Sequence, residues 1–363
     1  MDAEQRKAAK TRPGRPPTIS DVARTAGVSP MTVSRVINGD TRVRPATRER
    51  VDAAISKLNY TPNPAARSLA GAEQIRIGLL YSNPSAAYLS EFLVGMLDQA
   101  SRGDIQLVIE KCEPGGHEVE AARHLVSGGV HGLILPPPLC DSTAILAALT
   151  EANVAAVVVA TGRPPESASA VSIDDHAASL AMTRHLIALG HRRIGFVCGN
   201  PNQTASARRL DGYRNALAEA EIAIDDNLIA PGLFSYRSGL DAAEHLLTQE
   251  DRPTAVFASN DDMAAAVVAV AHRHGIDVPG DLSVCGFDDT AIATTIWPEL
   301  TTIHQPIADM SRAALDLVAG EVRRRRAGER PAAQHLLLDF KLVRRQSDAA
   351  PRRRPPAVAA RQS

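Results

Sequence analysis

Apolar side chains follow two different patterns along the chain, and the change between them falls near residue 73. Before that point, Val33, Val36 and Ile37 show the three- and four-residue spacing of a short amphipathic helix. From residue 75 onward, runs that are almost entirely apolar, such as IRIGLLY at 75–81, alternate with helical patterns. Uninterrupted apolar strands separated by helices are typical of a parallel sheet covered on both faces. The sequence therefore predicts an all-α N-terminal unit followed by an α/β body.

The N-terminal unit is predicted to contain a helix-turn-helix. A first helix over 19–26 ends at Gly27, which tolerates the left-handed backbone found at helix ends. A second helix has Ser29 as its N-cap and Pro30 as its first residue, where a missing N–H costs nothing. A third helix over 45–58 carries enough apolar residues on one face to close a small core. The second helix of such a motif enters the DNA major groove, although similar helix pairs also occur in proteins that do not bind DNA.

The outer side of the second helix has side chains suited to DNA. Thr32 and Ser34 can bond phosphates or base edges, and Arg35 offers the fork that matches guanine O6 and N7. Pro30 and Met31 can contact thymine methyl groups. The pattern therefore favours base reading by this helix.

The segment TPNPAARSLA at 61–70 allows two interpretations. Asn63 can cap a helix that begins at Pro64, but this helix would have only about seven residues, whereas isolated helices below ~12–15 residues are marginal in water. A DNA minor groove could hold it in place, with Leu69 inserted as an apolar wedge. By composition alone, a Pro-rich linker is the alternative.

The body is predicted to form two doubly wound parallel sheets with a cleft between them. Strands are expected at 75–81, 105–110, 131–136, 155–160, 171–173, 193–199, 255–259 and 283–288. Helices are expected at 88–100, 117–126, 177–189, 206–220, 238–247 and 262–274. Ligands of such folds lie beyond the carboxyl ends of the strands. This rule selects Tyr81–Asn83, Ala160–Thr161, Gly199–Asn200, Ser259–Asp261 and Phe287–Asp289.

Composition adds a charge asymmetry to this picture. Residues 1–70 hold 13 basic and 6 acidic side chains, and the rest of the chain holds 27 basic and 35 acidic ones. A basic unit on an acidic body indicates electrostatic attraction for phosphate at one end. The four cysteines are far apart, which favours core positions in a reducing compartment over disulfides or a metal site. The N-terminus lacks the apolar segment of a secretory signal, and no apolar run is long enough for a membrane span. We therefore expect a cytoplasmic protein without a membrane partner, a metal or a cofactor.

The runs DVARTAGVSPMTVSRVING and TRERVDAAISKLNYTPNPAARSLAG resemble the DNA-binding headpiece and hinge of LacI/GalR-type bacterial repressors. The resemblance implies base reading by Pro30, Met31 and Arg35, and a hinge helix that pairs with that of a second subunit and inserts Leu69. Arg44 stands where the family often has Ser, so a weaker cap of the third helix and a phosphate contact are expected there. Ala70 stands where purine-type members carry Lys. The residues expected to contact DNA are Thr18, Ser29, Pro30, Met31, Thr32, Ser34, Arg35, Asn38, Arg44, Asn63, Arg67, Leu69 and Ala70.

The body is more loosely similar to the effector domain of the same family, a relative of periplasmic sugar-binding proteins in which three crossovers join two lobes. The expected first lobe is 73–172 with 307–333, and the expected second lobe is 174–303 with 334–345. The remaining boundaries are 1–17 for a disordered basic tail, 18–61 for the headpiece, 62–72 for the hinge and 346–363 for a disordered tail. The last segment lacks heptads, so a homodimer is favoured over a coiled-coil tetramer.

Several side chains are candidates for an effector site. Arg209 stands three residues before Gly212, where the family places an Arg that grips the effector, and its fork suits two vicinal hydroxyls or a carboxylate. The alternative is a surface ion pair, which fits Arg208 better. Asp288 ends a strand and can accept hydrogen bonds from sugar hydroxyls, and Phe234 matches an aromatic that lies against the ligand ring. Asn260 fits a helix cap and a ligand contact equally well. The further candidates are Ser82, Tyr88 and Gln305.

The resulting hypothesis is a sequence-specific transcription regulator, a repressor controlled by a small molecule in the cleft. A sugar is the effector class most common in the family, although Ala160 stands where lac-type members have Asp. A purine-type, corepressor-dependent regulator is one alternative. An α/β enzyme acting on sugars is another, but the sequence has no G-x-S-x-G, Walker, G-x-G-x-x-G or H-E-x-x-H motif. A periplasmic ligand carrier is disfavoured by the basic headpiece.

Overall fold

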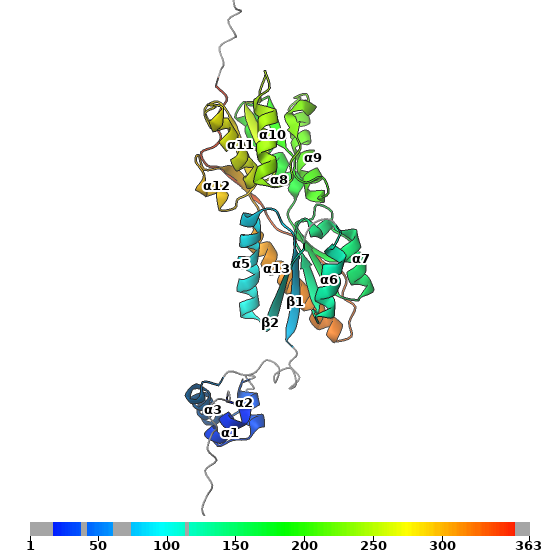
Figure 1. Cartoon of the computed structure of the whole chain (residues 1–363), viewed down its shortest axis with the longest axis vertical. Helices are drawn as coiled ribbons and strands as arrows, with labels where there is room; N and C mark the ends of the chain where they lie inside the picture. The colour runs from blue at the N-terminus through cyan, green and yellow to red at the C-terminus, as the bar shows by residue number, and fades with distance from the viewer. Residues whose placement is uncertain (1–16, 38–41, 61–73, 113–115, 353–363) are drawn as a thin grey trace, which may run out of the picture. The chain divides into compact units, whose positions relative to one another are not determined.

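The computed structural model describes residues 17–37, 42–60, 74–112 and 116–352. The chain divides into two compact units, Met1–Gln74 and Ile75–Ser363 (Figure 1). In the part of the chain that the structure describes, no helix has the length and hydrophobicity needed to cross a membrane.

Among its described residues, the first unit contains three helices; the bounds of the first and third and the start of the second are those predicted. These are α1 (Ile19–Ala26), α2 (Pro30–Ile37) and α3 (Pro45–Leu58). Val22, Val33 and Val51 contribute one side chain from each helix to a buried core, as their helical spacing requires. Gly27 ends α1 in the left-handed conformation, with φ of 66°, and places α2 directly after the turn.

The helix starts are capped in the way that their sequences predict. The Thr18 amide donates to the Asp21 carboxylate at 2.9 Å, which gives α1 a reciprocal capping box. The Thr32 amide donates to the Ser29 hydroxyl at 3.2 Å at the start of α2. Arg44 precedes α3 and supplies no side-chain cap, which confirms the weaker cap expected there.

In its described residues, the second unit contains two six-stranded sheets, which define its two lobes. Two doubly wound sheets were predicted, but the strands at 229–230, 301–304, 335–337 and 341–343 were not among the predicted ones. The order of the first sheet is β11-β5-β4-β3-β1-β2, and that of the second is β12-β10-β9-β8-β6-β7. The strands of the first lobe are β1 (Ile75–Tyr81), β2 (Ile105–Lys111), β3 (Gly132–Leu135), β4 (Ala155–Val159), β5 (Ser169–Ser172) and β11 (His335–Leu337). Those of the second lobe are β6 (Ile194–Val197), β7 (Ile229–Ala230), β8 (Ala255–Ala258), β9 (Ser283–Asp288), β10 (Thr301–His304) and β12 (Lys341–Val343).

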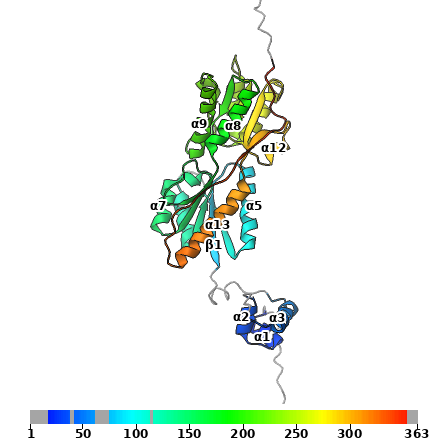
Figure 2. The same cartoon turned by 180° about the vertical axis from the view of Figure 1, so that it is seen from behind.

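Helices cover both faces of each sheet. In the first lobe they are α5 (Ala86–Arg102), α6 (Glu118–Ser127), α7 (Thr143–Glu151) and α13 (Ile307–Arg326). In the second lobe they are α8 (Asp175–Ala188), α9 (Thr204–Glu219), α10 (Tyr236–Leu247), α11 (Asp261–Arg273) and α12 (Ile292–Thr295). Figure 2 shows α13 lying across the back of the first sheet beside α5. Leu79 of β1 faces α5 and α13, and Leu80 joins the core under α6 and α7, because successive residues of a strand point to opposite faces.

The third crossover lies later in the chain than predicted. We expected residues 334–345 to belong to the second lobe, but β11 pairs in parallel with β5 of the first sheet, with Leu336 opposite Val171. Only β12 joins the second sheet, where it runs antiparallel to β10. The chain therefore crosses between Leu337 and Lys341, because each lobe completes its sheet with one short edge strand from this segment.

The prediction that the C-terminal tail is disordered from residue 346 is wrong for residues 346–352. Ser347 is buried, its hydroxyl accepts from the Thr301 amide at 2.9 Å, and its carbonyl accepts from the Val284 amide at 2.8 Å. Asp348 pairs with His185 at 2.8 Å. This segment therefore supplies partners for backbone groups at the end of the second sheet, which a Pro- and Arg-rich composition did not reveal. Residues 353–363 lie outside the described part.

The close approach of α5 and α13 gives a test of lobe packing. A Cβ at Gly95 would lie 2.1 Å from the Ser311 hydroxyl and 2.2 Å from the Ala308 carbonyl, so Gly95→Ala must push the helices apart. We expect it to lower the free energy of unfolding by about 1–3 kcal/mol in urea titrations. The matched control is Gly320→Ala, where a Cβ meets nothing within 4 Å. Because Ala has a higher helix propensity than Gly, this change should raise the free energy of unfolding by roughly 0.5–1 kcal/mol. Equal effects of the two changes would contradict this interpretation.

Candidate functional site

The outer face of α2 presents the side chains predicted to read bases. Met31 is 67% exposed, and Pro30 and Arg35 are also exposed, whereas Val33 and Val36 are buried. Thr32 and Ser34 are half-buried along the edge of this face, and Arg44 is exposed before α3. The helix therefore has one side committed to the core and one side free for a partner.

Five of the predicted DNA contacts cannot be placed. Asn38, Asn63, Arg67, Leu69 and Ala70 lie outside the described residues, and so does the predicted hinge helix. Base reading by the remaining residues stays a prediction.

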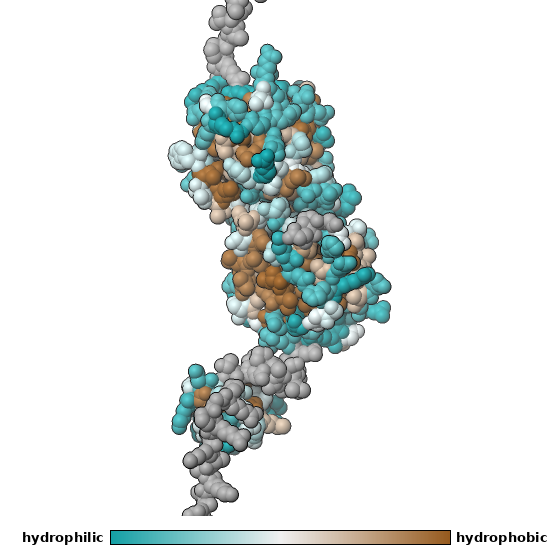
Figure 3. All heavy atoms as spheres, viewed as in Figure 1, coloured by the Kyte–Doolittle hydropathy of each residue, from teal (hydrophilic) through white to brown (hydrophobic). Residues whose placement is uncertain are grey.

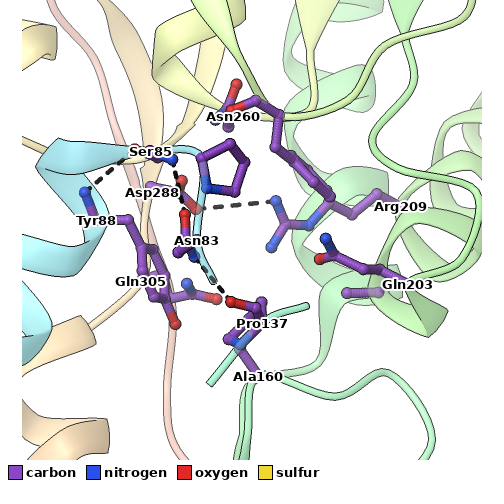
Figure 4. Close-up of a pocket in the computed structure, with 13 residues that line it drawn as sticks. Asn83, Ser85, Tyr88, Pro137, Ala160, Gln203, Arg209, Asn260, Asp288 and Gln305 are labelled. Atoms are coloured by element: carbon purple, nitrogen blue, oxygen red, sulfur yellow. Dashed lines mark hydrogen bonds and ion pairs between the residues drawn. The ribbon is translucent and has the colours of Figure 1, made fainter. Parts of the chain in front are cut away.

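A pocket lies between the two lobes of the body, at the carboxyl ends of strands from both sheets (Figure 4). It encloses about 410 Å³ of empty space, part of which is open to solvent. The residues that line it are Asn83, Pro84, Ser85, Tyr88, Pro137, Ala160, Gln203, Ala205, Arg209, Phe234, Asn260, Asp288 and Gln305.

The predicted effector residues converge on this pocket, with one exception. The candidates that line it are Tyr88, Arg209, Phe234, Asn260, Asp288 and Gln305. Ser82 does not line it; the connection after β1 contributes Asn83, Pro84 and Ser85 instead. The rule of strand carboxyl ends had selected Asn83 and Ala160, but no signal in the sequence had indicated Gln203.

Arg209 is held at the centre of the pocket wall by partners from four elements. Its Nε donates to Asp175 Oδ1 at 2.8 Å, and its Nη1 donates to the Ser259 carbonyl at 2.5 Å. The guanidinium carbon lies 3.5 Å from the centroid of the Phe287 ring and 5.6 Å from that of the Phe234 ring. The residue is only 4% exposed, so the alternative of a surface ion pair does not apply to it.

Two carboxyl groups share this one guanidinium. Asp288 Oδ1 lies 3.8 Å from Arg209 Nη1 (Figure 4), and Asp175 Oδ1 lies 2.8 Å from Arg209 Nε. Burial raises the pKa of Asp288 well above its ordinary value, and the charge of Arg209 opposes this rise. Burial likewise raises the pKa of Asp175, again against Arg209. Both carboxyl groups are therefore protonated more readily in this site than in water.

Several buried polar atoms around the pocket have no hydrogen-bond partner among the described residues. They include the Tyr88 hydroxyl and both amide atoms of Gln305, which line the pocket, together with Asp175 Oδ2 and the Ser206 hydroxyl. Leaving such a group unpaired costs about 1–3 kcal/mol. A donor-and-acceptor set of this kind, facing an open pocket, suits a ligand with several hydroxyl groups.

Backbone strain gathers at the same place. Ala160, Phe234 and Asp288 have φ values of 55°, 59° and 106°, in the region that side-chain-bearing residues seldom adopt. All three line the pocket. Such conformations cluster at ligand sites, where the surrounding structure holds a side chain in a required position.

Asn260 and Asp261 have different roles, the first as a helix cap and the second in the core. The Asn260 side chain accepts from the Met263 amide at 3.0 Å, which confirms the cap, and donates to the Phe234 carbonyl at 3.0 Å. Asp261 accepts from the Thr302 hydroxyl at 2.6 Å and the Thr290 amide at 2.8 Å. Asp261 thus serves the fold, as expected, and Asn260 fixes the position of the Phe234 ring.

Comparisons with known proteins match both units of this chain. Residues 18–63 match the family model of bacterial regulatory proteins of the lacI family, and residues 183–347 match that of the periplasmic binding protein-like domain. Catabolite control protein A of Priestia megaterium is 33% identical over 83% of this chain and 91% of its own length. The HTH-type transcriptional repressor PurR of Vibrio atlanticus is 35% identical over 84% of this chain and 92% of its own length.

Solved structures agree in fold. The lac repressor dimer bound to operator and the anti-inducer ONPF superposes with a TM-score of 0.77 at 30% identity, over 93% of this chain and 100% of that one. The CelR–cellobiose complex gives a TM-score of 0.69 at 33% identity, over 91% of this chain and 99% of that one.

A helix-turn-helix unit joined to a two-lobed body with a cleft defines a DNA-binding transcription regulator with an effector domain. The chain belongs to the LacI family of bacterial regulatory proteins. Its relatives are transcription regulators.

The buried Asp261 carboxyl should make the stability of the body depend on pH. Burial raises its pKa to about 7, so the folded state holds a proton that the unfolded state releases near pH 4. The contribution to stability is complete below pH 4 and is lost as pH rises to 7, a decrease of at most roughly 4 kcal/mol. We expect Asp261→Asn to flatten this slope in urea titrations from pH 4 to 7.5, whereas Asp251→Asn, at the surface, should leave it unchanged. A slope that persists in Asp261→Asn would assign it to other groups.

Proposed function

We propose that this regulator is a homodimeric repressor that binds a pseudo-palindromic operator and responds to an uncharged, hydroxyl-rich effector in the interlobe pocket. The observation that supports the effector most directly is the pocket's unpaired polar set, Tyr88 and Gln305, beside Arg209 and Asp288. Together these groups offer both donors and acceptors, which a ligand with several hydroxyls can use. The proposal places the protein in the bacterial cytoplasm, where its DNA lies.

The charge balance of the pocket favours a sugar over a sugar phosphate. Among the described residues that line the pocket, Arg209 is the only basic one, and it already pairs with Asp175 and Asp288. An anionic ligand would therefore find no uncommitted cation in a poorly solvated cleft. Two structural relatives have a sugar in their printed titles, namely the complex with cellobiose and an Enterococcus faecium regulator with bound ribose. The screen described below identifies which sugar this chain binds. A nucleobase that acts as corepressor is the alternative.

An apolar patch on the first lobe supports the dimer. Val94 and Leu97 of α5 are 59% and 56% exposed, and Ile109 of β2 is 45% exposed. Figure 3 shows brown residues gathered on the face of the lobe where α5 lies. Contiguous exposed apolar surface of this kind marks an interaction site. Two copies joined there would each bring one headpiece to a half-site of the operator.

The proposed switch couples the pocket to the segment at 62–72. If two hinge helices pair in the central minor groove and insert Leu69, each is stabilised only while its twin and the DNA are present. An effector that favours a lobe arrangement separating them acts as an inducer, and one that favours their pairing acts as a corepressor. The shift is limited by the difference in effector affinity for the two arrangements.

An enzymatic role for the cleft has little support. Of the adjacent pair Asp288 and Asp289, only Asp288 lines the pocket, whereas Asp289 bonds His304 at 3.1 Å and Arg345 at 2.5 Å. The pair therefore does not form two carboxylates that face a common substrate. We propose that the pocket binds its ligand without turnover.

Two measurements test the proposal as a whole. Selection of bound sequences from random DNA should return a site with two inverted half-sites. A thermal-shift screen should then include neutral mono- and disaccharides, their phosphate esters and nucleobases, since a ligand that binds only the folded state raises the melting temperature. A selected site without inverted symmetry would contradict the dimer, and stabilisation by phosphate esters alone would contradict the effector class.

Arg35→Ala should relax base preference as well as weaken binding. A bidentate contact to a guanine contributes roughly 1–3 kcal/mol of discrimination, so the preference at one position of each half-site should fall by about that amount. Gel shifts with single-base operator variants measure it. Arg24→Ala is the control, because Arg24 lies on α1 and its charge pairs with Asp21. Loss of affinity by an equal factor for all sequences in Arg35→Ala would refute base reading.

Asp288→Asn should abolish the response to the effector while leaving operator affinity intact. Asn tolerates the positive φ of this position and replaces the carboxyl group with an amide of similar shape, which changes the hydrogen bonds offered to a hydroxyl. The matched control is Asp289→Asn, which changes the neighbouring carboxylate outside the pocket. Release of operator DNA is measured with the sugar that gives the largest thermal shift. An unchanged response in Asp288→Asn would remove this residue from the site.

A further inference from the structure

The first turn of α9 is capped by the opposite lobe. α9 begins at Thr204, and its own N-cap residue, Gln203, forms no side-chain cap. Asp141 takes this role, since its Oδ2 accepts from the Thr204 amide at 2.8 Å and its Oδ1 accepts from the Thr204 hydroxyl at 2.8 Å. Asp141 ends the short 3-10 helix η1 (Leu139–Asp141) after β3 of the first sheet, whereas α9 follows β6 of the second. The cap therefore exists only while the two lobes are together.

Two more hydrogen bonds complete this contact. Thr161 donates its hydroxyl to Asp141 Oδ1 at 2.7 Å, and the Gly162 amide donates to the Thr204 hydroxyl at 2.8 Å. A Cβ at Gly162 would lie 2.7 Å from the backbone of Thr204. The two backbone segments can therefore approach closely because residue 162 is glycine. We refer to Asp141, Thr161, Gly162 and Thr204 as the Asp141 clasp.

The clasp adjoins the effector pocket. Gln203 and Ala205, on either side of Thr204, line the pocket, and Arg209 follows on the same helix. Figure 4 shows Gln203 and Arg209 on the green ribbon of the second lobe, with Pro137 and Ala160 of the first lobe beside them. The turn that Asp141 caps is thus the turn that presents this wall of the pocket.

A second cross-lobe bond lies at another edge of the pocket. The Ser85 hydroxyl, at the start of α5, donates to Asp262 Oδ2 of α11 at 2.5 Å. The Asp141 clasp differs from it because it satisfies a backbone amide and places a negative charge at a helix N-terminus, where the helix dipole favours it. Opening the lobes would remove both effects at once.

We propose that Asp141 is a positioning residue that links lobe closure to the placement of Arg209. When the lobes separate, the Thr204 amide and hydroxyl lose their partner, so the cap stabilises the closed arrangement and orders the start of α9 only there. This inference rests on the proposed function for its regulatory meaning. In this proposal, part of the preference for the closed arrangement comes from the protein itself and not from the effector.

The test measures the separation of the lobes in the full-length protein without any ligand. Spin labels are placed at Ala144→Cys on α7 and Asp211→Cys on α9, both exposed positions. The background is Cys198→Ser, because the other three cysteines are buried. Pulsed dipolar spectroscopy then gives the distribution of distances. Asp141→Ala should move the ratio of closed to open populations toward open by roughly 2- to 30-fold, the range expected for a lost helix cap.

Two matched variants separate positioning from general destabilisation. Ser142→Ala removes the neighbouring cap, which bonds the Ile145 amide within the first lobe, and should leave the distance distribution unchanged. Thr204→Val removes the hydroxyl of the clasp and should move the distribution in the same direction as Asp141→Ala, whereas Thr204→Ser should restore it. In the double variant Asp141→Ala with Thr204→Val, the two effects should not add, because the residues act through one contact.

An Asp141→Ala distribution equal to that of the unchanged protein would overturn the proposal, and so would an equal shift in Ser142→Ala. No effector enters the measurement, so a wrong effector class leaves this test intact. Conversely, failure of the clasp would leave the pocket and its proposed ligand unaffected.

Discussion

The body depends on one buried cation. Arg209 joins Asp175 of α8, the Ser259 carbonyl after β8 and Asp288 at the end of β9, and its flat face rests against Phe287. A guanidinium is well suited to this role, because its planar fork serves several acceptors while its face packs against a ring. The same contacts that remove Arg209 from solvent aim its remaining N–H groups at the pocket. Structure and recognition therefore share one side chain.

The strained residues around this cation share a location at the pocket. Ala160 follows β4, Phe234 lies in the connection after β7 and Asp288 ends β9, and all three have positive φ values. Their strain is maintained by the core beneath them, for instance by the bond from Asn260 to the Phe234 carbonyl. A site prepared in this way loses little conformational entropy when a ligand binds. The polar atoms that remain unpaired then supply the preference for hydroxyl groups.

Hydrogen bonds at two places join the lobes beside the pocket. The Ser85–Asp262 bond and the Asp141 clasp both link groups of different lobes, so both would be lost if the lobes parted. A ligand that contacts both lobes stabilises the closed arrangement by the difference between its affinities for the closed and the open arrangement, and not by its total affinity. In a regulator of this family, the useful output of the pocket is therefore a shift in population.

By itself, the sequence determined what depends on local spacing and on backbone chemistry. Helical periodicity and the Gly27 and Ser29 signals located α1 and α2, and continuous apolar runs located strands such as β1 and β9. The rule of strand carboxyl ends led to Asp288 and Asn260, because it depends only on the direction of the chain. Family resemblance then supplied the role expected of Arg209.

Only the tertiary structure decided which distant polar groups meet. Asp141 and Thr204 are separated by 63 residues and lie in different lobes, so no local pattern could pair them. The parallel pairing of β11 with β5 and the burial of Ser347 likewise depend on which sheet edges remain open when each lobe closes. Gln203 lines the pocket for the same reason, since its position follows from the approach of two lobes. Hydrophobic periodicity records whether a residue is buried, but it does not record its partner, because partners across a cleft are chosen by the packing of whole domains.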